Sequence, residues 1–220
     1  QKVMPESDSK RWLKNYNFNV PNGKTVSPDK LGEAAIEVGY PVALKMISPG
    51  LVHKTEAGAV VLNLKDEEVL KLAVEKMRID VTAYDADAAS ELFLVEAMSP
   101  NPVAELIINL RQDPQFGAAL VLGSGGVLVE LMADTATLLL PTSPADIIRA
   151  LKSLRVRRLL EGFRGRPAVD IPKVAEEIYK LCIAYQNHGK TITEIEINPL
   201  FVYRDTVSAI DALIQVPVDT

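Results

Sequence analysis

The sequence predicts an α+β protein that folds as two lobes, residues 1–98 and 99–220. Short apolar segments separated by turn residues indicate strands that pair in antiparallel sheets. Apolar stripes of helical spacing lie between them, and several begin at a capping residue or end at a glycine. The lobe boundary is placed at Ser99-Pro100-Asn101-Pro102, because proline interrupts both helical and sheet hydrogen bonding.

Composition narrows the class of function. With 24 Lys and Arg against 29 Asp and Glu, the net charge of -5 argues against nucleic acid or an anionic membrane as the main partner. No apolar run approaches the roughly 20 residues of a membrane helix. The single cysteine, Cys182, lies in a helical apolar pattern, which predicts a buried thiol in a reducing cytoplasm. Because the chain begins with Gln1 and not Met, we expect a processed or excised part of a longer polypeptide.

In the first lobe, the helices are predicted from their caps and apolar spacing. Ser27-Pro28 places proline at the first helical position after a capping serine, and Gly39 ends that helix. Asp66 caps the next helix, after which the polar residues 80–90 predict an exposed loop. In chain order we expect a helix over 7–16, a helix over 28–38, strands over 41–47 and 59–64, a helix from 66 and a strand over 91–98.

The second lobe is predicted to be mainly antiparallel sheet with two helices. Ser143-Pro144, with Asp146 three residues after the serine, repeats the capping pattern. Gly123-Ser124-Gly125-Gly126 is expected to be a tight turn, because Leu128 stands where a dinucleotide-binding loop has its third glycine. In chain order we expect strands over 104–110, 118–122 and 127–132, a helix from 144, a helix over 172–186, and strands over 191–203 and 207–216.

The hairpin over residues 41–64 is predicted to bind phosphate. Lys45 lies in the middle of an apolar strand, where a buried ammonium needs an anionic partner. The tip that follows combines cations, a hydroxyl and glycine: His53, Lys54, Thr55 and Gly58. Glycines leave backbone N–H groups able to converge on oxyanions, so we expect the phosphates of a nucleotide here.

The C-terminal hairpin is predicted to hold a metal ion. If Arg204-Asp205 forms a two-residue turn, Asn198 lies directly across from Asp211, with Glu196 on the same face. The opposite face should enter the core with these apolar residues: Ile195, Ile197, Phe201, Ile210, Ala212 and Ile214. Two carboxylates and an amide oxygen are hard ligands that suit Mg²⁺. A solvated polar face is the alternative interpretation.

Six short motifs carry a resemblance to a known family. In order they are Leu44-Lys45, HKTEAG from His53, LVEAM ending at Met98, DPQFG from Asp113, LLEGFRGRPAVD from Leu159 and EINPL from Glu196. Closed by Asp211, the series resembles the ATP-grasp module of ADP-forming acyl-CoA synthetases, relatives of the succinyl-CoA synthetase β subunit. The family loop usually reads Gly-Gly where this chain has Gly58-Ala59. The resemblance implies an ATP-grasp fold with a nucleotide cleft between its lobes.

The resemblance also implies roles for the phosphate-binding hairpin. Lys45 would contact the inner phosphates of ATP or ADP, and the loop with Lys54 and Thr55 would cover the outer ones. In the family a phosphohistidine carries the phosphoryl group between the nucleotide and an acyl phosphate site on another domain. His53 would either accept that group or hydrogen-bond it in transit. An exposed loop histidine with neither role is the alternative.

The remaining implied contacts concern the base, the ribose and the metal. Adenine would be held by the backbone from Glu96 through Ala97 to Met98, and Glu105 would bind the ribose. Mg²⁺ would be bound by the predicted cluster on the C-terminal hairpin. For Glu96 and Glu105, ordinary surface charge on a strand is the alternative interpretation.

By resemblance, the reaction converts acyl-CoA, ADP and phosphate to acid, CoA and ATP, and this chain performs its nucleotide half. The CoA and acid sites are expected on a separate ligase subunit or domain, so we expect a hetero-oligomer or a multidomain chain. Two other classes stay open. One is a non-catalytic nucleotide sensor within a larger acyltransferase-type regulatory protein, and the other is a self-contained carboxylate–amine ligase.

Overall fold

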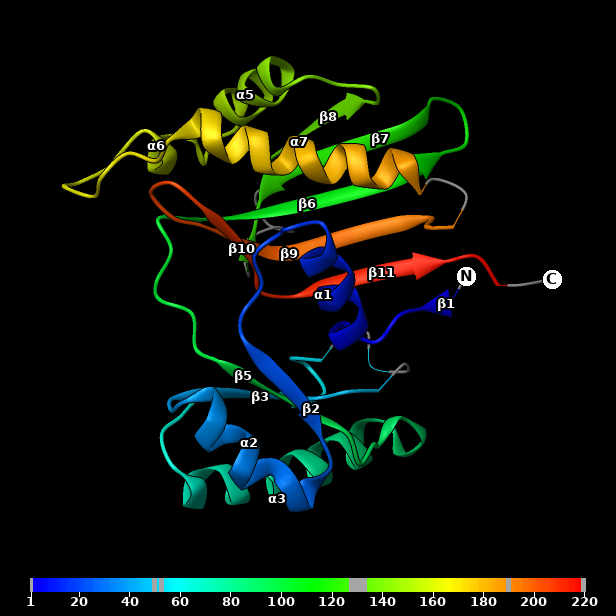
Figure 1. The fold of residues 1–220 in the computed structure, drawn as a ribbon, viewed down its shortest axis with the longest axis vertical. Helices are drawn as coiled ribbons and strands as arrows, with labels where there is room; N and C mark the ends of the chain where they lie inside the picture. Colours follow the sequence, from blue (N-terminus) through cyan, green and yellow to red (C-terminus); the bar gives the residue numbers. More distant parts are fainter. Residues whose placement is uncertain (1, 49–50, 52–53, 127–133, 189–190, 219–220) are drawn as a thin grey trace. The chain divides into compact units, whose positions relative to one another are not determined.

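The computed structural model describes residues 2–48, 51, 54–126, 134–188 and 191–218 (Figure 1). The chain divides into two compact units. The smaller unit is Pro21–Pro100, and the larger unit combines Gln1–Val20 with Asn101–Thr220. The first twenty residues therefore lie outside the unit that the predicted first lobe, 1–98, assigned them to.

Pairing between the chain ends explains this correction. β1 (Lys2–Val3) pairs with β11 (Ala212–Val216), and α1 (Glu6–Asn15) follows directly. The backbone N–H of Ile214 in β11 donates to the Ser9 hydroxyl oxygen of α1 at 3.2 Å. A strand and a helix far apart in sequence are thus joined, which local apolar patterns do not reveal.

The smaller unit is one antiparallel sheet with helices packed against it. Its strands lie in the order β2-β5-β3-β4. They are β2 (Gly23–Val26), β3 (Val42–Met46), β4 (Val60–Leu64) and β5 (Phe93–Ala97). The two helices on the sheet are α2 (Leu31–Val38) and α3 (Glu67–Tyr84), with short 3-10 turns η1 (Pro28–Lys30) and η2 (Ala86–Ala88) (Figure 1). Leu44, Met46, Met77 and Phe93 join strands and α3 in a core that excludes water.

The predicted start of α3 and the predicted end of α2 are confirmed, whereas the predicted end of α3 is wrong. The Asp66 side chain accepts the Val69 N–H at 2.9 Å at the start of α3, and Gly39 ends α2 with a positive φ of 91°. The exposed loop predicted over 80–90 begins too early, because α3 continues to Tyr84. Val81 is fully buried there, which keeps the last turn on the core.

The larger unit is built on a seven-stranded antiparallel sheet of order β1-β11-β9-β6-β7-β8, with β10 beside β9. Its remaining strands are β6 (Ala104–Asp113), β7 (Gly117–Ser124), β8 (Thr135–Leu139), β9 (Glu194–Val202) and β10 (Val207–Ala209). Helices α5 (Pro144–Ser153) and α7 (Ile171–Asn187) lie along one face of the sheet, and α6 (Arg157–Leu160) adjoins α5 (Figure 1). The strand predicted over 127–132 lies outside the described residues, and β8 was not predicted.

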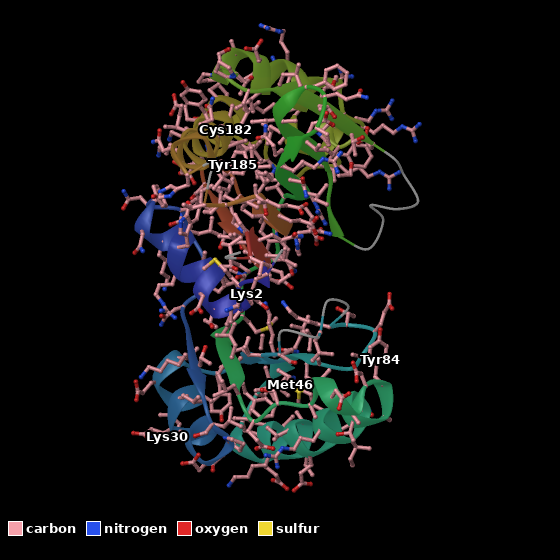
Figure 2. All side chains as sticks on the ribbon, turned by 90° about the vertical axis from the view of Figure 1, so that its right-hand side faces the viewer. Lys2, Lys30, Met46, Tyr84, Cys182 and Tyr185 are labelled. Carbon is pink, nitrogen blue, oxygen red and sulfur yellow. The ribbon has the colours of Figure 1, made fainter. Side chains whose placement is uncertain are left out.

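Local signals in the larger unit are confirmed. Ser143 and Asp146 form the predicted capping box at the start of α5. Cys182 on α7 is fully buried, and this burial raises the pKa of its thiol to about 12. Figure 2 labels it beside Tyr185, whose hydroxyl donates to the Thr193 carbonyl at 3.0 Å. Across the described ranges, none of the helices is both long and apolar enough to cross a membrane.

Candidate functional site

The anion that meets Lys45 in this structure is the carboxylate of Glu96. β3 pairs with β5 so that Ala43 faces Glu96, which places Lys45 and Glu96 diagonally on one face. The Lys45 Nζ and Glu96 Oε2 atoms are 3.1 Å apart, and the side chains are only 5% and 3% exposed. The ordinary-surface interpretation of Glu96 is therefore wrong, because a buried carboxylate of this kind needs its counter-ion.

Sequence reasoning assigned Glu96 only a backbone role. One feature of the sequence could have indicated the ion pair. Glu96 lies inside the apolar run LVEAM, just as Lys45 lies inside its own apolar strand. Two opposite charges in two apolar strands of one lobe are best explained by mutual pairing. Their pairing still depends on strand register, which neither sequence segment specifies alone.

The hairpin tip is described from Lys54 onward, while His53 lies outside the described residues. The Ala59 N–H donates to the Lys54 carbonyl at 2.8 Å, and the Gly58 N–H to the Thr55 carbonyl at 3.2 Å. Gly58 has a φ of +69°, and a Cβ there would lie 2.8 Å from Asp80 Cβ. Glycine is thus needed at Gly58, whereas Ala59 buries its methyl group completely, so the departure from Gly-Gly leaves this turn intact.

The backbone donors predicted to hold adenine are used within the smaller unit. The Ala97 N–H donates to the Asn22 carbonyl at 2.8 Å, and the Met98 N–H donates to the Pro41 carbonyl at 3.2 Å. Recognition of adenine through this segment stays a prediction. Base binding through the Met98 N–H would require exchange of its bond to Pro41.

The predicted register of the C-terminal hairpin is confirmed. β9 and β11 pair Ala212 with Ile197, and the Asn198 N–H donates to the Asp211 carbonyl at 3.2 Å. Asn198 and Asp211 are therefore direct cross-strand neighbours. Glu196 lies two residues along the same face of β9, paired with Leu213. The pairing predicted for this hairpin is therefore correct, and the role of the three residues as metal ligands stays a prediction.

The predicted apolar face of this hairpin is wrong beyond Asn198. β9 contains one more residue than β6 between two pairs, Leu200 with Leu106 and Ile197 with Ile108. This bulge resets the alternation, so that Leu200 is fully buried. The two residues misplaced in the core, and only partly buried, are Phe201 and Ile210. Two of the predicted ligands lie where pairing passes from β11 to β10, a common place for functional side chains.

Glu196 has a partner that sequence reasoning did not identify. The Asn109 side-chain amide donates to Glu194 Oε1 at 2.5 Å and to Glu196 Oε2 at 3.1 Å. Asn109 is only 9% exposed, and its own Oδ1 atom is buried without a partner in the described structure. Asn109 therefore holds the Glu196 carboxylate in position through one hydrogen bond. The other lone pairs of that carboxylate stay available to a ligand.

The tight turn predicted over Gly123–Gly126 is shorter than expected, because Gly123 and Ser124 belong to β7. Gly125 and Gly126, here called the glycine turn, contact two of the predicted site residues, which the sequence interpretation did not anticipate. The Gly125 N–H donates to the Glu105 carbonyl at 2.8 Å, and the Gly126 N–H donates to Asn198 Oδ1 at 3.3 Å. A Cβ at Gly126 would lie 2.2 Å from Glu105 Oε2, and its φ is +76°. A residue with a side chain would be strained at Gly126. Through these two hydrogen bonds, the turn connects Glu105, the predicted ribose-binding acid, with Asn198, a predicted metal ligand.

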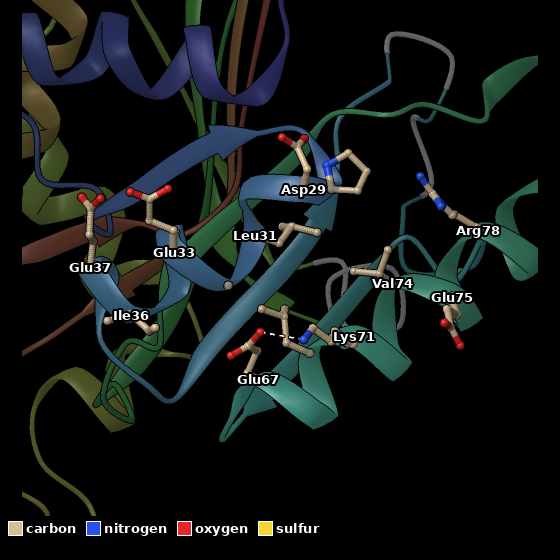
Figure 3. A pocket seen from close by; sticks show the side chains of 13 residues that line it. Asp29, Leu31, Glu33, Ile36, Glu37, Glu67, Lys71, Val74, Glu75 and Arg78 are labelled. Atoms are coloured by element: carbon tan, nitrogen blue, oxygen red, sulfur yellow. Dashed lines mark ion pairs between the residues drawn. The ribbon is translucent and has the colours of Figure 1, made fainter.

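Each unit has a cavity, and only the one in the larger unit is lined by a predicted site residue. In the larger unit, a cavity of about 670 Å³ is lined by residues including Glu105, Gly125, Arg155 and Arg166. In the smaller unit, a cavity of about 750 Å³ lies between α2 and α3 (Figure 3). That second cavity contains none of the predicted site residues, and one of its walls carries the Glu67–Lys71 ion pair (Figure 3). The Glu105 cavity therefore matches the prediction better.

The donor set on the C-terminal hairpin fits a magnesium ion by its chemistry. Within the described residues, no group of three or more His, Cys, Asp or Glu side chains could hold a metal by itself. The predicted cluster has two carboxylates and one amide, and Mg²⁺ takes few protein ligands and completes its shell with water and phosphate. Asn198 and Asp211, with Glu196 held by Asn109, would hold the ion.

These features define a nucleotide-binding class of protein, and comparison with known proteins identifies the family. The model of the ATP-grasp domain matches residues 1–216. The chain therefore belongs to the ATP-grasp family, which confirms the predicted fold. It is 34% identical over 94% of its length to the β subunit of acetate–CoA ligase (ADP-forming) II from Pyrococcus furiosus, covering 88% of that protein.

Solved structures of similar proteins agree with this assignment. One is "dinucleotide forming Acetyl-coenzyme A synthetase 1" from Ca. Korarchaeum cryptofilum, in complex with coenzyme A and Ca-AMPCP, among others. It matches with a TM-score of 0.92 and 32% identity over 99% of this chain and 94% of that chain. A second structure of that protein contains Mg-AMPPCP and has its phosphohistidine segment pointing towards the nucleotide binding site. It matches with a TM-score of 0.82 and 30% identity over 99% of this chain and 94% of that chain.

The Lys45–Glu96 pair predicts a specific pattern of stabilities. Lys45→Met or Glu96→Leu alone removes the counter-ion of a buried charge and should lower the free energy of unfolding by about 3–5 kcal/mol. The double variant removes both charges and should lie within about 1 kcal/mol of the wild type. Urea unfolding of the four proteins measures this cycle.

The matched control is Lys24–Glu37, an ion pair of the same unit whose side chains are 46% and 49% exposed. Lys24→Met and Glu37→Leu should each change the free energy of unfolding by less than about 1 kcal/mol. Equal effects in the two pairs would contradict a special role for the buried one.

Proposed function

We propose that this chain is the nucleotide-binding module of an ADP-forming acyl-CoA synthetase of the acetate–CoA ligase type. It transfers a phosphoryl group between a phosphohistidine and ADP or ATP in the presence of Mg²⁺. The observation that carries the proposal is the 34% identity to an acetate–CoA ligase β subunit over 94% of the chain. The chemistry of the predicted site supports the same proposal, because phosphoryl transfer requires positive charge and hard oxygen ligands for a metal ion, and Lys45 and the C-terminal hairpin would supply them.

Lys45 supplies positive charge to the nucleotide. Phosphoryl transfer demands positioning and charge neutralisation more than covalent chemistry from the protein. Glu96 orients the ammonium within the sheet, because the two side chains are buried and 3.1 Å apart. When a phosphate approaches, Lys45 exchanges part of its interaction with Glu96 for one with the phosphate oxygens. Lys54 and Thr55 cover the outer phosphates.

In the larger unit, Glu105 binds the ribose, and Asn198 and Asp211 hold the metal with Glu196. These residues would hold a magnesium ion, which would neutralise charge on the phosphate oxygens. Gly126 supports this arrangement, because its N–H orients the Asn198 amide while its missing side chain leaves room for the Glu105 carboxylate. The base is held by the backbone of Glu96, Ala97 and Met98.

His53 accepts the phosphoryl group in this proposal. A ring nitrogen of His53 attacks the γ-phosphorus, the bond from that phosphorus to the bridging oxygen breaks, and ADP leaves. The reverse transfer regenerates ATP. The acid and CoA sites lie on a separate ligase subunit or domain, so the working enzyme is a hetero-oligomer or a larger chain. We place it in the cytoplasm, in keeping with the single cysteine and its buried position.

The direct test of this function is phosphoryl exchange. The chain, incubated with Mg²⁺, ATP and radiolabelled ADP, should transfer label into ATP, and His53→Ala should abolish the transfer. His188→Ala is the control, because His188 is the only other histidine and lies in a cluster with Trp12 and Tyr16. Unchanged exchange in His53→Ala would remove His53 from the reaction.

The metal site predicts a selective loss of magnesium dependence. In Asp211→Asn, one carboxylate ligand is lost, so the gain in ADP affinity on adding Mg²⁺ should fall by about tenfold. Asp205→Asn, in the turn of the same hairpin, is the control and should keep the gain. Calorimetric titration of ADP with and without Mg²⁺ measures both, and an unchanged gain in Asp211→Asn would place the metal elsewhere.

A further inference from the structure

Positive charge is concentrated in one segment of this acidic chain. Residues 149–166, here called the cation-rich segment, contain seven Arg and Lys and one acid, Glu161. The segment therefore carries +6 while the whole chain carries -5, so the rest of the chain carries -11. It spans the end of α5, all of α6 and the following loop, and includes the LLEGFRGRPAVD motif up to Arg166, to which the proposed function gives no role.

Most of these cations form no ion pair with an acid that the structure describes. Arg149 pairs with Asp146, and Arg157 pairs with Glu161 at 3.5 Å. Within the described part of the chain, the cations of the segment that form no ion pair are Lys152, Arg155, Arg158, Arg164 and Arg166. On other helices, by contrast, three exposed lysines each pair with an acid one turn away: Lys71 with Glu67, Lys76 with Asp80, and Lys180 with Glu177. Grouped, unpaired like charges repel each other and favour binding of an anion.

Three of the unpaired cations line one cavity together with Arg157. A cavity of about 510 Å³ lies at the junction of α5 and α6, and four of its six lining residues are cationic: Lys152, Arg155, Arg157 and Arg158. Arg155 also lines the neighbouring cavity of about 670 Å³ that contains Glu105. The two cavities are thus adjacent, but Lys152 and Arg158 line only the cationic one.

The backbone beneath these cations is held rigidly. The Asp134 carboxylate accepts the N–H groups of Arg155 at 2.8 and 2.9 Å and of Val156 at 3.3 Å, and the Ser124 hydroxyl at 2.7 Å. Burial raises the pKa of Asp134, but these hydrogen bonds outweigh it and lower the pKa below its ordinary value. Buried Leu154 and Val156 anchor the same turn in the core. An anion would therefore bind without ordering the loop, which favours affinity.

We propose that the cavity at the α5–α6 junction is a second anion site, which binds a ligand with two or more linked phosphate groups. Arginine offers a planar fork that matches phosphate oxygens, and lysine adds a compact charge. One phosphate needs fewer cations than this cavity presents, whereas a diphosphate or triphosphate can contact all of them. Lys152 and Arg158 do not line the Glu105 cavity, and the proposed function gives neither residue a role in binding the nucleotide. An acidic protein segment would fit the exposed charge but would not require a cavity.

Inorganic tripolyphosphate tests the site without a nucleotide. Calorimetric titration into the intact chain, with EDTA and about 0.15 M NaCl to screen surface charge, should show one site that orthophosphate fills much more weakly. Lys152→Gln/Arg158→Gln should weaken tripolyphosphate binding by at least about tenfold. Arg149→Gln/Lys173→Gln removes the same charge from two cations paired with Asp146 and Asp170, and should keep the affinity within about twofold.

Several outcomes would overturn the proposal. Equal weakening in the two double variants would mean general charge attraction, and no binding at this salt concentration would mean no site. Loss of binding in Lys45→Met/Glu96→Leu, the variant expected to stay folded, would assign the phosphate to the nucleotide site. A hexaglutamate peptide that binds as tightly as tripolyphosphate would favour an acidic protein partner instead. Failure of ADP binding with tripolyphosphate binding intact would count against the proposed function and not against this site.

Discussion

A buried lysine ammonium and a buried glutamate carboxylate, 3.1 Å apart, impose the constraint on which the smaller unit depends. Moving two such charges from water into a protein costs several kcal/mol for each ion, and only good mutual geometry offsets it. The pair therefore fixes how β3 lies against β5. A slip of one residue would turn Lys45 and Glu96 to opposite faces and break the ion pair. The same register positions the hairpin tip that follows β3.

In the larger unit, strand register and hydrogen bonds between polar side chains position the predicted ligands. Asn198, Asp211 and Glu196 lie together because one hairpin register and one bulge put them there. Asn109 and the glycine turn then orient these side chains from neighbouring strands. The ligands are thus supported by groups that would not themselves bind the metal or the nucleotide, as is usual for sites that must be preorganised.

The features predicted correctly from sequence are those that local physics decides. The caps at Asp66 and Ser143 depend on residues within one helical turn, and the hairpin register follows from its two-residue turn. The features missed depend on partners distant in sequence. The Lys45–Glu96 pair, the β9 bulge opposite β6 and the joining of α1 to β11 each require knowledge of which strand lies beside which. The motif resemblance supplied the family and its expected ligands, yet it did not indicate that Glu96 would be the partner of Lys45.

The central claim is that the buried cation of the smaller unit serves the nucleotide as well as the fold. It is tested most directly by the ADP affinity of Lys45→Met/Glu96→Leu, which keeps the unit folded because no buried charge is left unpaired. Calorimetry with Mg²⁺ should give a dissociation constant at least about tenfold weaker than the wild type. The exposed-pair variant Lys24→Met/Glu37→Leu should bind as the wild type does. Wild-type affinity in the folded Lys45→Met/Glu96→Leu protein would contradict the account, leaving Lys45 and Glu96 as a structural pair alone.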